Sequence, residues 1–142
     1  DKGVAVWPAQ AINYTNKTQF LFRIQKGILD INDTGVNDYI KPENQRVPFR
    51  NMIYIGDSDT DIPCMSLVNA NGGHSIGVYD PFKKDKEKVY KMMRHHRIRY
   101  YAPADYSNGS KLDTLVKQII RKTAAYEVLE GEYIHCKYEA EE

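Results

Sequence analysis

The stretch Met52-Ile53-Tyr54-Ile55-Gly56-Asp57-Ser58-Asp59-Thr60-Asp61-Ile62-Pro63 decides the fold predicted for this chain. Four apolar residues lead into a glycine, and three carboxylates follow at alternate positions before a proline. A short apolar run bounded by turn residues predicts a buried strand, Met52–Ile55, and the residues after Asp61 predict the start of a helix. The acidic residues are therefore expected at a strand-to-helix turn.

The position of this acidic turn favours a metal site. In an open α/β sheet, such a turn lies at the carboxyl ends of the strands, which is the edge where ligands bind. Carboxylates crowded at that edge repel one another unless a cation neutralises them, and a hard cation such as Mg²⁺ prefers oxygen ligands. We therefore interpret Gly56–Asp61 as a magnesium site.

Strands and helices alternate in the sequence after the turn. The periodicity of apolar residues and the capping signals predict a helix at Ile62–Ala70, a strand at His74–Tyr79, a helix at Phe82–Arg94 that Asp80-Pro81 begins, a strand at Ile98–Ala102 and an amphipathic helix with Leu112, Leu115, Val116, Ile119 and Ile120 on one face. The remaining residues, Gly131–Glu142, are interpreted as an acidic tail that contains tyrosines.

Before the turn, the sequence predicts fewer regular elements. Val4–Trp7 has the composition of a strand, and Asn16 with Gln19 three positions later predicts a capping box at the start of a helix that Gly27 ends. The segment 30–50 is rich in Asn, Asp, Gly and Pro, and this composition predicts an irregular connection with one helical turn near Val36–Tyr39.

This alternation predicts an α/β protein, a Rossmann-like three-layer sandwich with a mostly parallel sheet. A chain of 142 residues is expected to form a single domain. The net charge of +1 gives no strongly basic surface for nucleic acid. The sequence has no apolar run of the ~20 residues that a membrane span needs and no leader, so we expect a cytoplasmic protein with no membrane partner.

The acidic turn also resembles a known family motif. Gly56-Asp57-Ser58-Asp59-Thr60-Asp61, followed by Gly72-Gly73-His74-Ser75-Ile76-Gly77-Val78, looks like the GDxxxD motif of the haloacid dehalogenase (HAD) superfamily, and the likeness is greatest to its phosphatase-like hydrolases. The resemblance covers roughly Lys17 to Tyr106. It implies that Asp57 binds Mg²⁺ and that Asp61 is a second ligand or contacts a metal-bound water. Ser58 and Asp59 would then lie around these ligands.

The family also has an upstream lysine that neutralises the phosphoryl group, and the resemblance implies Lys26 for this role, with Lys17 as the alternative. HAD enzymes carry an aspartate nucleophile in a DxDx[T/V] motif after an N-terminal strand, which Asp30-Ile31-Asn32-Asp33-Thr34 does not match. We therefore expect an incomplete HAD core. It would be the C-terminal part of a phosphatase that acts on a small phosphorylated substrate through an aspartyl-phosphate, and it would be inactive without the nucleophile.

Two other readings of the same residues remain open. One is a non-catalytic Rossmann-like module whose acidic turn holds a structural cation or a partner. The other is a metal-dependent transferase that uses Asp57 and Asp59 on a nucleotide-bound metal, although no glycine-rich GxGxxG fingerprint is present. An incomplete sheet would leave an unpaired edge strand, so self-association of the chain is also expected.

Overall fold

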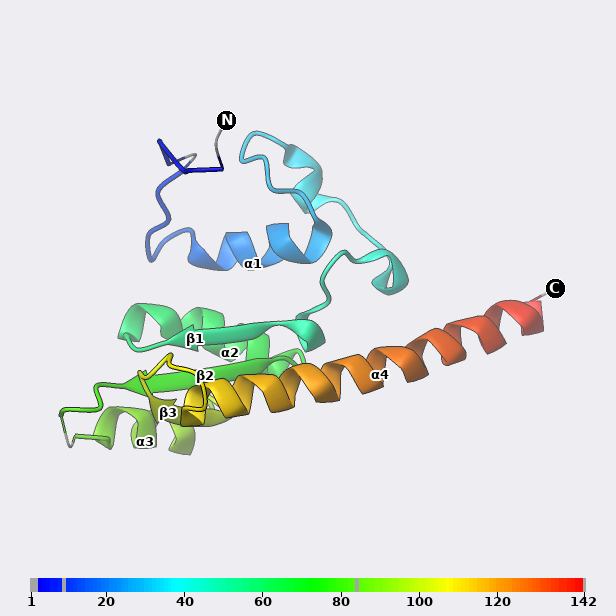
Figure 1. Cartoon of the computed structure of the whole chain (residues 1–142). Coiled ribbons are helices and arrows are strands. Elements are labelled where there is room, and N and C mark those ends of the chain that lie inside the picture. Colours follow the sequence, from blue (N-terminus) through cyan, green and yellow to red (C-terminus); the bar gives the residue numbers. More distant parts are fainter. Residues whose placement is uncertain (1–2, 9, 84, 142) are drawn as a thin grey trace.

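The computed structural model describes residues 3–8, 10–83 and 85–141, and within them three parallel strands form one open sheet in the order β1-β2-β3. The strands are β1 (Ile53–Gly56), β2 (His74–Tyr79) and β3 (Tyr100–Pro103). Helices connect them, as Figure 1 shows. The predicted α/β class with a parallel sheet is therefore confirmed.

Register and helix bounds complete the description of the elements. Ile55 pairs with Ile76, and Ile76 pairs in turn with Tyr100. The helices are α1 (Lys17–Lys26), α2 (Ile62–Ala70), α3 (Glu87–Arg94) and α4 (Lys111–Glu141), with short 3₁₀ turns at η1 (Thr34–Asn37), η2 (Pro42–Asn44), η3 (Phe49–Asn51) and η4 (Asp59–Asp61).

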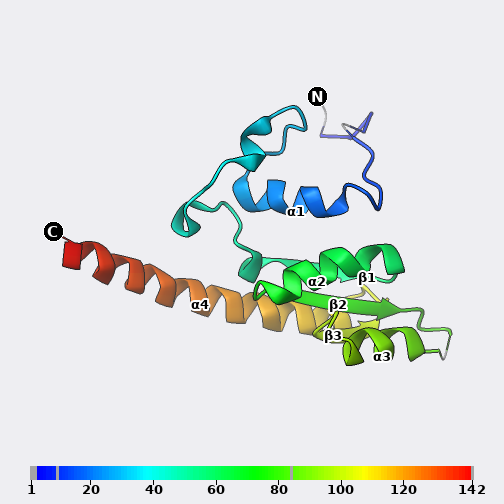
Figure 2. The ribbon, with the colours of Figure 1, turned by 180° about the vertical axis from the view of Figure 1, so that it is seen from behind.

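Helices cover both faces of the sheet. Strands that are apolar on both sides need such cover, because each face would otherwise expose hydrophobic area to water. One face packs against α4, where Ile76, Val78 and Ala102 meet Leu112 and Ile119. The other face packs against α2 and α3, and Figures 1 and 2 show these two helices on the side of the sheet away from α4.

Helix α1 packs on α2 through a further apolar cluster that includes Leu21 and Val68. It ends as predicted at Gly27, whose φ of 72° lies in the left-handed region that favours glycine. Arg23, a charged residue of α1, is buried. Its guanidinium donates to the carbonyls of Ile28, Asp30, Ile31 and Asp33 and so holds the loop that follows α1.

The elements around the acidic turn match the predicted ones closely. Strand β1 lies within one residue of the prediction, and α2 and β2 have the predicted bounds. The start of α3 was predicted wrongly. The Asp80 carboxylate accepts the Phe82 N–H at 2.9 Å in a local turn, and α3 begins only at Glu87. Lys84 belongs to the segment predicted to start this helix, and it lies outside the described residues.

The prediction of an acidic tail at Gly131–Glu142 was also wrong. Residues 111–141 form one continuous helix, α4, whose C-terminal half extends beyond the sheet in both views (Figures 1 and 2). Its glycine costs about 1 kcal/mol of helix stability, but the surrounding Glu, Leu, Ala and Lys residues favour helix and no proline interrupts them. None of the helices in the described ranges combines the length and hydrophobicity that crossing a membrane requires.

Two predictions near the N-terminus were wrong as well. Val4–Trp7 forms no strand, because nothing in the described residues pairs with it, and its large side chains are exposed. Asn16 does precede α1, but its side chain accepts the N–H of Asn13 at 2.8 Å instead of capping the helix. The capping box with Gln19 is therefore not formed.

Candidate active site

The acidic turn lies at the carboxyl end of β1, as the sequence predicted. Its first residue must be glycine, because a Cβ on Gly56 would lie 2.7 Å from Asp61 Oδ2 and 2.8 Å from Met65 Cε. Ser58 and Asp61 form a capping box over η4, which leads directly into α2. The chain therefore turns tightly here and brings the carboxylate of Asp61 close to Gly56, the last residue of β1.

Asp61 is the most constrained side chain of the turn. Its residue is only 7% exposed, and both carboxylate oxygens are engaged. Oδ1 accepts from Lys17 Nζ at 2.8 Å and from the Tyr54 hydroxyl at 2.9 Å. Oδ2 accepts from the Ser58 N–H at 3.1 Å and from the Ser58 hydroxyl at 2.8 Å. Hydrogen bonds to Asp61 therefore hold the turn in place and connect it to Lys17 of α1 and Tyr54 of β1.

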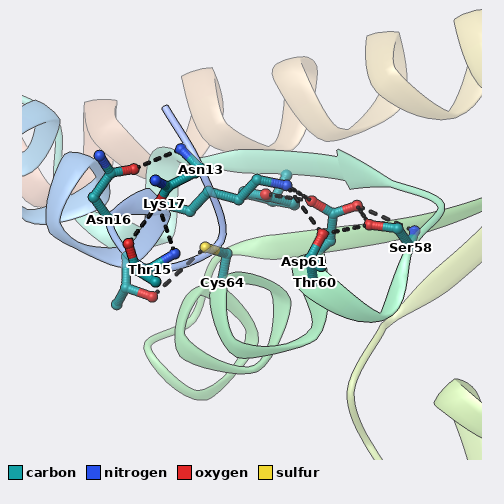
Figure 3. Close-up of polar contacts among 10 residues, drawn as sticks. Asn13, Thr15, Asn16, Lys17, Ser58, Thr60, Asp61 and Cys64 are labelled. Atoms are coloured by element: carbon teal, nitrogen blue, oxygen red, sulfur yellow. Dashed lines mark hydrogen bonds and ion pairs between the residues drawn. The ribbon is translucent and has the colours of Figure 1, made fainter. Parts of the chain in front are cut away.

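Lys17 reaches this carboxylate from the first turn of α1. Figure 3 shows its side chain lying across the gap between α1 and the turn, with the amine directed at Asp61. The amine also lies 3.4 Å from Thr60 Oγ1. Because Lys17 and Asp61 are 44 positions apart in the sequence, their ion pair joins two segments that only the tertiary fold brings together.

The electrostatics of this cluster keep both partners charged. Burial alone would raise the pKa of Asp61, but hydrogen bonds from Lys17, Ser58 and Tyr54 outweigh it and lower the pKa to about 2. The hydrogen bond to Asp61 raises the pKa of Lys17, and the nearby negative charge of Asp57 adds to that effect. Burial and the hydrogen bond to Asp61 raise the pKa of the Tyr54 hydroxyl. The Lys17 ammonium is therefore held at Asp61, and the negative charge of Asp57 in the same turn helps to keep it protonated.

The two aspartates predicted to hold Mg²⁺ differ in how many of their carboxylate oxygens are available to a cation. Asp57 is exposed, and its carboxylate accepts no hydrogen bond from the described residues, so its oxygens are available to a hard cation. Asp61 could bind a cation directly only by giving up Lys17, Tyr54 or Ser58. Within the described ranges, no three His, Cys, Asp or Glu side chains group as a metal site. This arrangement suits a cation held by one carboxylate together with water and substrate oxygens.

The other predicted site residues fall in three places. Ser58 contacts Asp61, as described above. The Asp59 side chain is exposed and pairs with Lys88 Nζ at 3.4 Å, away from Asp61. Lys26 Nζ donates to the carbonyls of Val36 and Asp38, each at 2.6 Å, and so closes the loop around η1. The geometry therefore brings Lys17, and not Lys26, to the acidic turn.

Tyr54 belongs to this cluster, although the sequence analysis did not single it out. It lies on β1 two residues before Gly56, on the face that packs against α2, and its hydroxyl reaches Asp61, the residue that precedes α2. A polar hydroxyl within an otherwise apolar strand was the only sequence signal, because a buried tyrosine usually has a hydrogen-bond partner for its O–H.

Comparisons with known proteins add one distant relative. An uncharacterized protein of Borreliella burgdorferi is 26% identical over 101 residues, which cover 71% of this chain. The matched region is about a third of that protein, since it covers 34% of its length. No protein-family model matches the chain, and no solved structure matches it.

Proposed function

We propose that this chain supplies the cation-holding turn and the phosphate-binding lysine of a Mg²⁺-dependent, HAD-like phosphatase with a Rossmann-like core. The observation that carries the proposal is the contact of 2.8 Å between Lys17 Nζ and Asp61 in the same turn as the exposed Asp57. An ammonium ion held in the same turn as an exposed carboxylate, at the carboxyl edge of a parallel sheet, can receive a phosphoryl group together with its cation.

Each residue then has a distinct role. Asp57 would hold Mg²⁺, which would neutralise phosphoryl charge when bound. The Lys17 ammonium would bind a phosphoryl oxygen and stabilise the negative charge that develops there. Asp61 acts through Lys17: it fixes the position of the amine and keeps it protonated, with Tyr54 and Ser58 holding the carboxylate in place.

The nucleophile would come from residues outside this stretch. The 142 residues contain no DxDx[T/V] sequence, and the matched region is only 34% of the length of the Borreliella burgdorferi relative. In the whole protein, an aspartate carboxylate would attack phosphorus and break the bond to the ester oxygen, so that the substrate's alcohol leaves and takes up a proton from solvent. Water would then hydrolyse the aspartyl-phosphate, releasing inorganic phosphate and regenerating the carboxylate. A small phosphorylated compound is the substrate class that this site fits.

The test is to express the whole open reading frame that contains these residues and to measure hydrolysis of p-nitrophenyl phosphate with and without Mg²⁺. We expect Mg²⁺-dependent turnover that falls by about 10²-fold or more in Asp57→Asn and in Lys17→Gln, since each removes a charge aimed at the phosphoryl group. Lys26→Gln should lower thermal stability and leave kcat unchanged. Equal turnover in wild type and Asp57→Asn would contradict the proposal, and so would turnover by the 142 residues alone.

A second candidate function also rests on a specific observation. Both oxygens of the Asp61 carboxylate are already satisfied by Lys17, Tyr54 and Ser58, so the pair with Lys17 can serve simply to join α1 to the sheet. The chain would then be a non-catalytic module. In that case Lys17→Gln would lower stability, but neither Mg²⁺ nor phosphate would bind at the turn.

A further inference from the structure

A cavity of about 290 Å³ lies at the amino ends of the strands, the edge of the sheet opposite the acidic turn. Its walls come from segments far apart in the sequence. They include Arg50 of η3, His74 at the start of β2, Arg99 just before β3, and Lys122, Thr123 and Tyr126 from the middle of α4. Figure 1 shows α4 passing along this end of the sheet before it extends beyond it.

The charge of the cavity wall is positive and only partly compensated. Arg50 pairs with Glu127, with Nε 2.8 Å from Oε1 and Nη2 3.3 Å from Oε2, and its guanidinium lies 5.6 Å from the centre of the Tyr126 ring. Arg99 Nε donates to Asn69 Oδ1 at 3.1 Å, which is a neutral partner. Within the described residues, neither Arg99 nor Lys122 forms an ion pair with a carboxylate.

His74, which lines the cavity, also carries a buried polar atom without a partner. His74 is only 1% exposed, and its Nδ1 has no hydrogen-bond partner among the described residues. Such atoms are uncommon in folded proteins and often mark a missing partner. Burial lowers the pKa of His74, and the positive charges of Lys122 and Arg99 lower it further. The imidazole therefore lies in the positive potential of these two side chains.

We propose that this cavity binds a small oxyanion, the phosphate or carboxylate group of a compact ligand, between Arg99 and Lys122 with the His74 imidazole as a hydrogen-bonding partner. Arginine and lysine are the side chains that bind such groups most strongly. The volume exceeds that of a single oxyanion, so the remainder of the ligand can lie against Tyr126. The site does not depend on the proposed phosphatase function, since it lies at the other edge of the sheet and shares no residue with the acidic turn.

Calorimetric titration of the 142-residue chain with inorganic phosphate and, separately, with malonate tests this proposal, with EDTA present so that no cation bridges phosphate to Asp57. The decisive variant is Lys122→Gln, an exposed change that should not disturb folding. Arg99→Gln is the second variant. Arg121→Gln, one position along the exposed surface of α4, is the matched control for net charge. Amide NMR shifts recorded in the same titrations locate the site.

Saturable binding of at least one of the two anions is expected, and the tighter one identifies the ligand group. Shifts should centre on Gly72, His74 and Thr123. Lys122→Gln and Arg99→Gln should each weaken binding by about tenfold, as loss of one charge-assisted hydrogen bond predicts, and Arg121→Gln by less than about twofold. Absence of saturable binding, equal effects of all three variants, or shifts confined to residues 56–61 would each overturn the proposal.

Discussion

At the scale of single residues, the account depends on how the carboxylate of Asp61 is satisfied. Four hydrogen bonds from three side chains and one backbone amide hold a residue that is almost fully buried. A buried carboxylate is tolerated only when it is paired in this way, because its desolvation is otherwise costly. The sequence located the acidic turn at the end of a strand, since spacing and flanking strand were both visible, and the role of Asp57 as a cation ligand stays a prediction. It favoured Lys26 over Lys17, although the structure brings Lys17 to the turn, because that contact joins residues 44 positions apart.

Replacing Asp61 should therefore destabilise the fold. We expect Asp61→Asn to lower the free energy of unfolding by about 2 kcal/mol, because the ion pair with Lys17 is lost and the amide cannot accept at every site that the carboxylate does. Asp59→Asn is the matched control and should change stability by less than about 0.5 kcal/mol, since its pair with Lys88 is exposed. Urea denaturation at pH 7 measures both, and equal effects would contradict the role given to Asp61.

The lowered pKa of Asp61 also predicts how stability depends on pH. The folded state keeps this carboxylate ionised down to about pH 2, whereas the unfolded chain protonates it near 3.8, so its contribution is complete above pH 4 and is lost between pH 4 and pH 2. After allowance for solvent screening, the loss should be about 1–2 kcal/mol. Denaturation at a series of pH values measures it. Wild type and Asp61→Asn should converge in stability as the pH falls, and a constant difference would contradict the assignment.

A third prediction at this scale concerns His74. Its imidazole should titrate below its ordinary pKa of 6.5, because burial and the charges of Lys122 and Arg99 disfavour the protonated ring. Lys122→Gln should move the pKa back toward 6.5, and Arg121→Gln should leave it unchanged. Histidine ring resonances followed by NMR between pH 4 and 8 report this value. A His74 pKa above 6.5 in the wild-type chain would contradict the positive potential described for the cavity.

At the scale of elements, the bounds of helices and strands were predicted correctly where the residues at their ends are strong start or stop signals. α2 and β2 were predicted correctly because Gly72-Gly73 separates them, while Asp61 with Pro63 marks the start of α2 and Asp80-Pro81 marks the end of β2. The start of α3 was missed because the side chain of Asp80 stabilises a local turn that competes with a helix cap. The full length of α4 was missed because Gly131 reads as a stop, although its position in the helix is unstrained and open.

Helix α4 therefore offers a direct test of its continuity. Nothing lies within 4 Å of a Cβ built on Gly131, so Gly131→Ala removes only the helix penalty of glycine, about 1 kcal/mol. We expect higher helical content by circular dichroism and slower amide hydrogen exchange in residues 125–141. Gly131→Pro should have the opposite effect. No change in exchange with alanine would indicate that this part of the chain is not helical in solution.

At the scale of the whole molecule, the two edges of the sheet have different characters. The carboxyl edge carries the Lys17–Asp61 pair and, in the same turn, the exposed Asp57, and the amino edge carries the cationic cavity under α4. The α/β architecture that separates them was predictable from the alternation of strands and helices. The cavity was not, because its residues come from η3, β2 and α4 and become neighbours only after folding.

The measurement that most directly tests the central claim is paramagnetic relaxation by Mn²⁺, used in place of Mg²⁺, in NMR spectra of the 142-residue chain. The account predicts that small amounts of Mn²⁺ broaden the amides of residues 56–58 and the signals of Lys17 first, and that Asp57→Asn abolishes this broadening while Asp59→Asn preserves it. Broadening that is unchanged in Asp57→Asn, or that centres on the glutamates at the end of α4, would contradict a cation site at the end of β1.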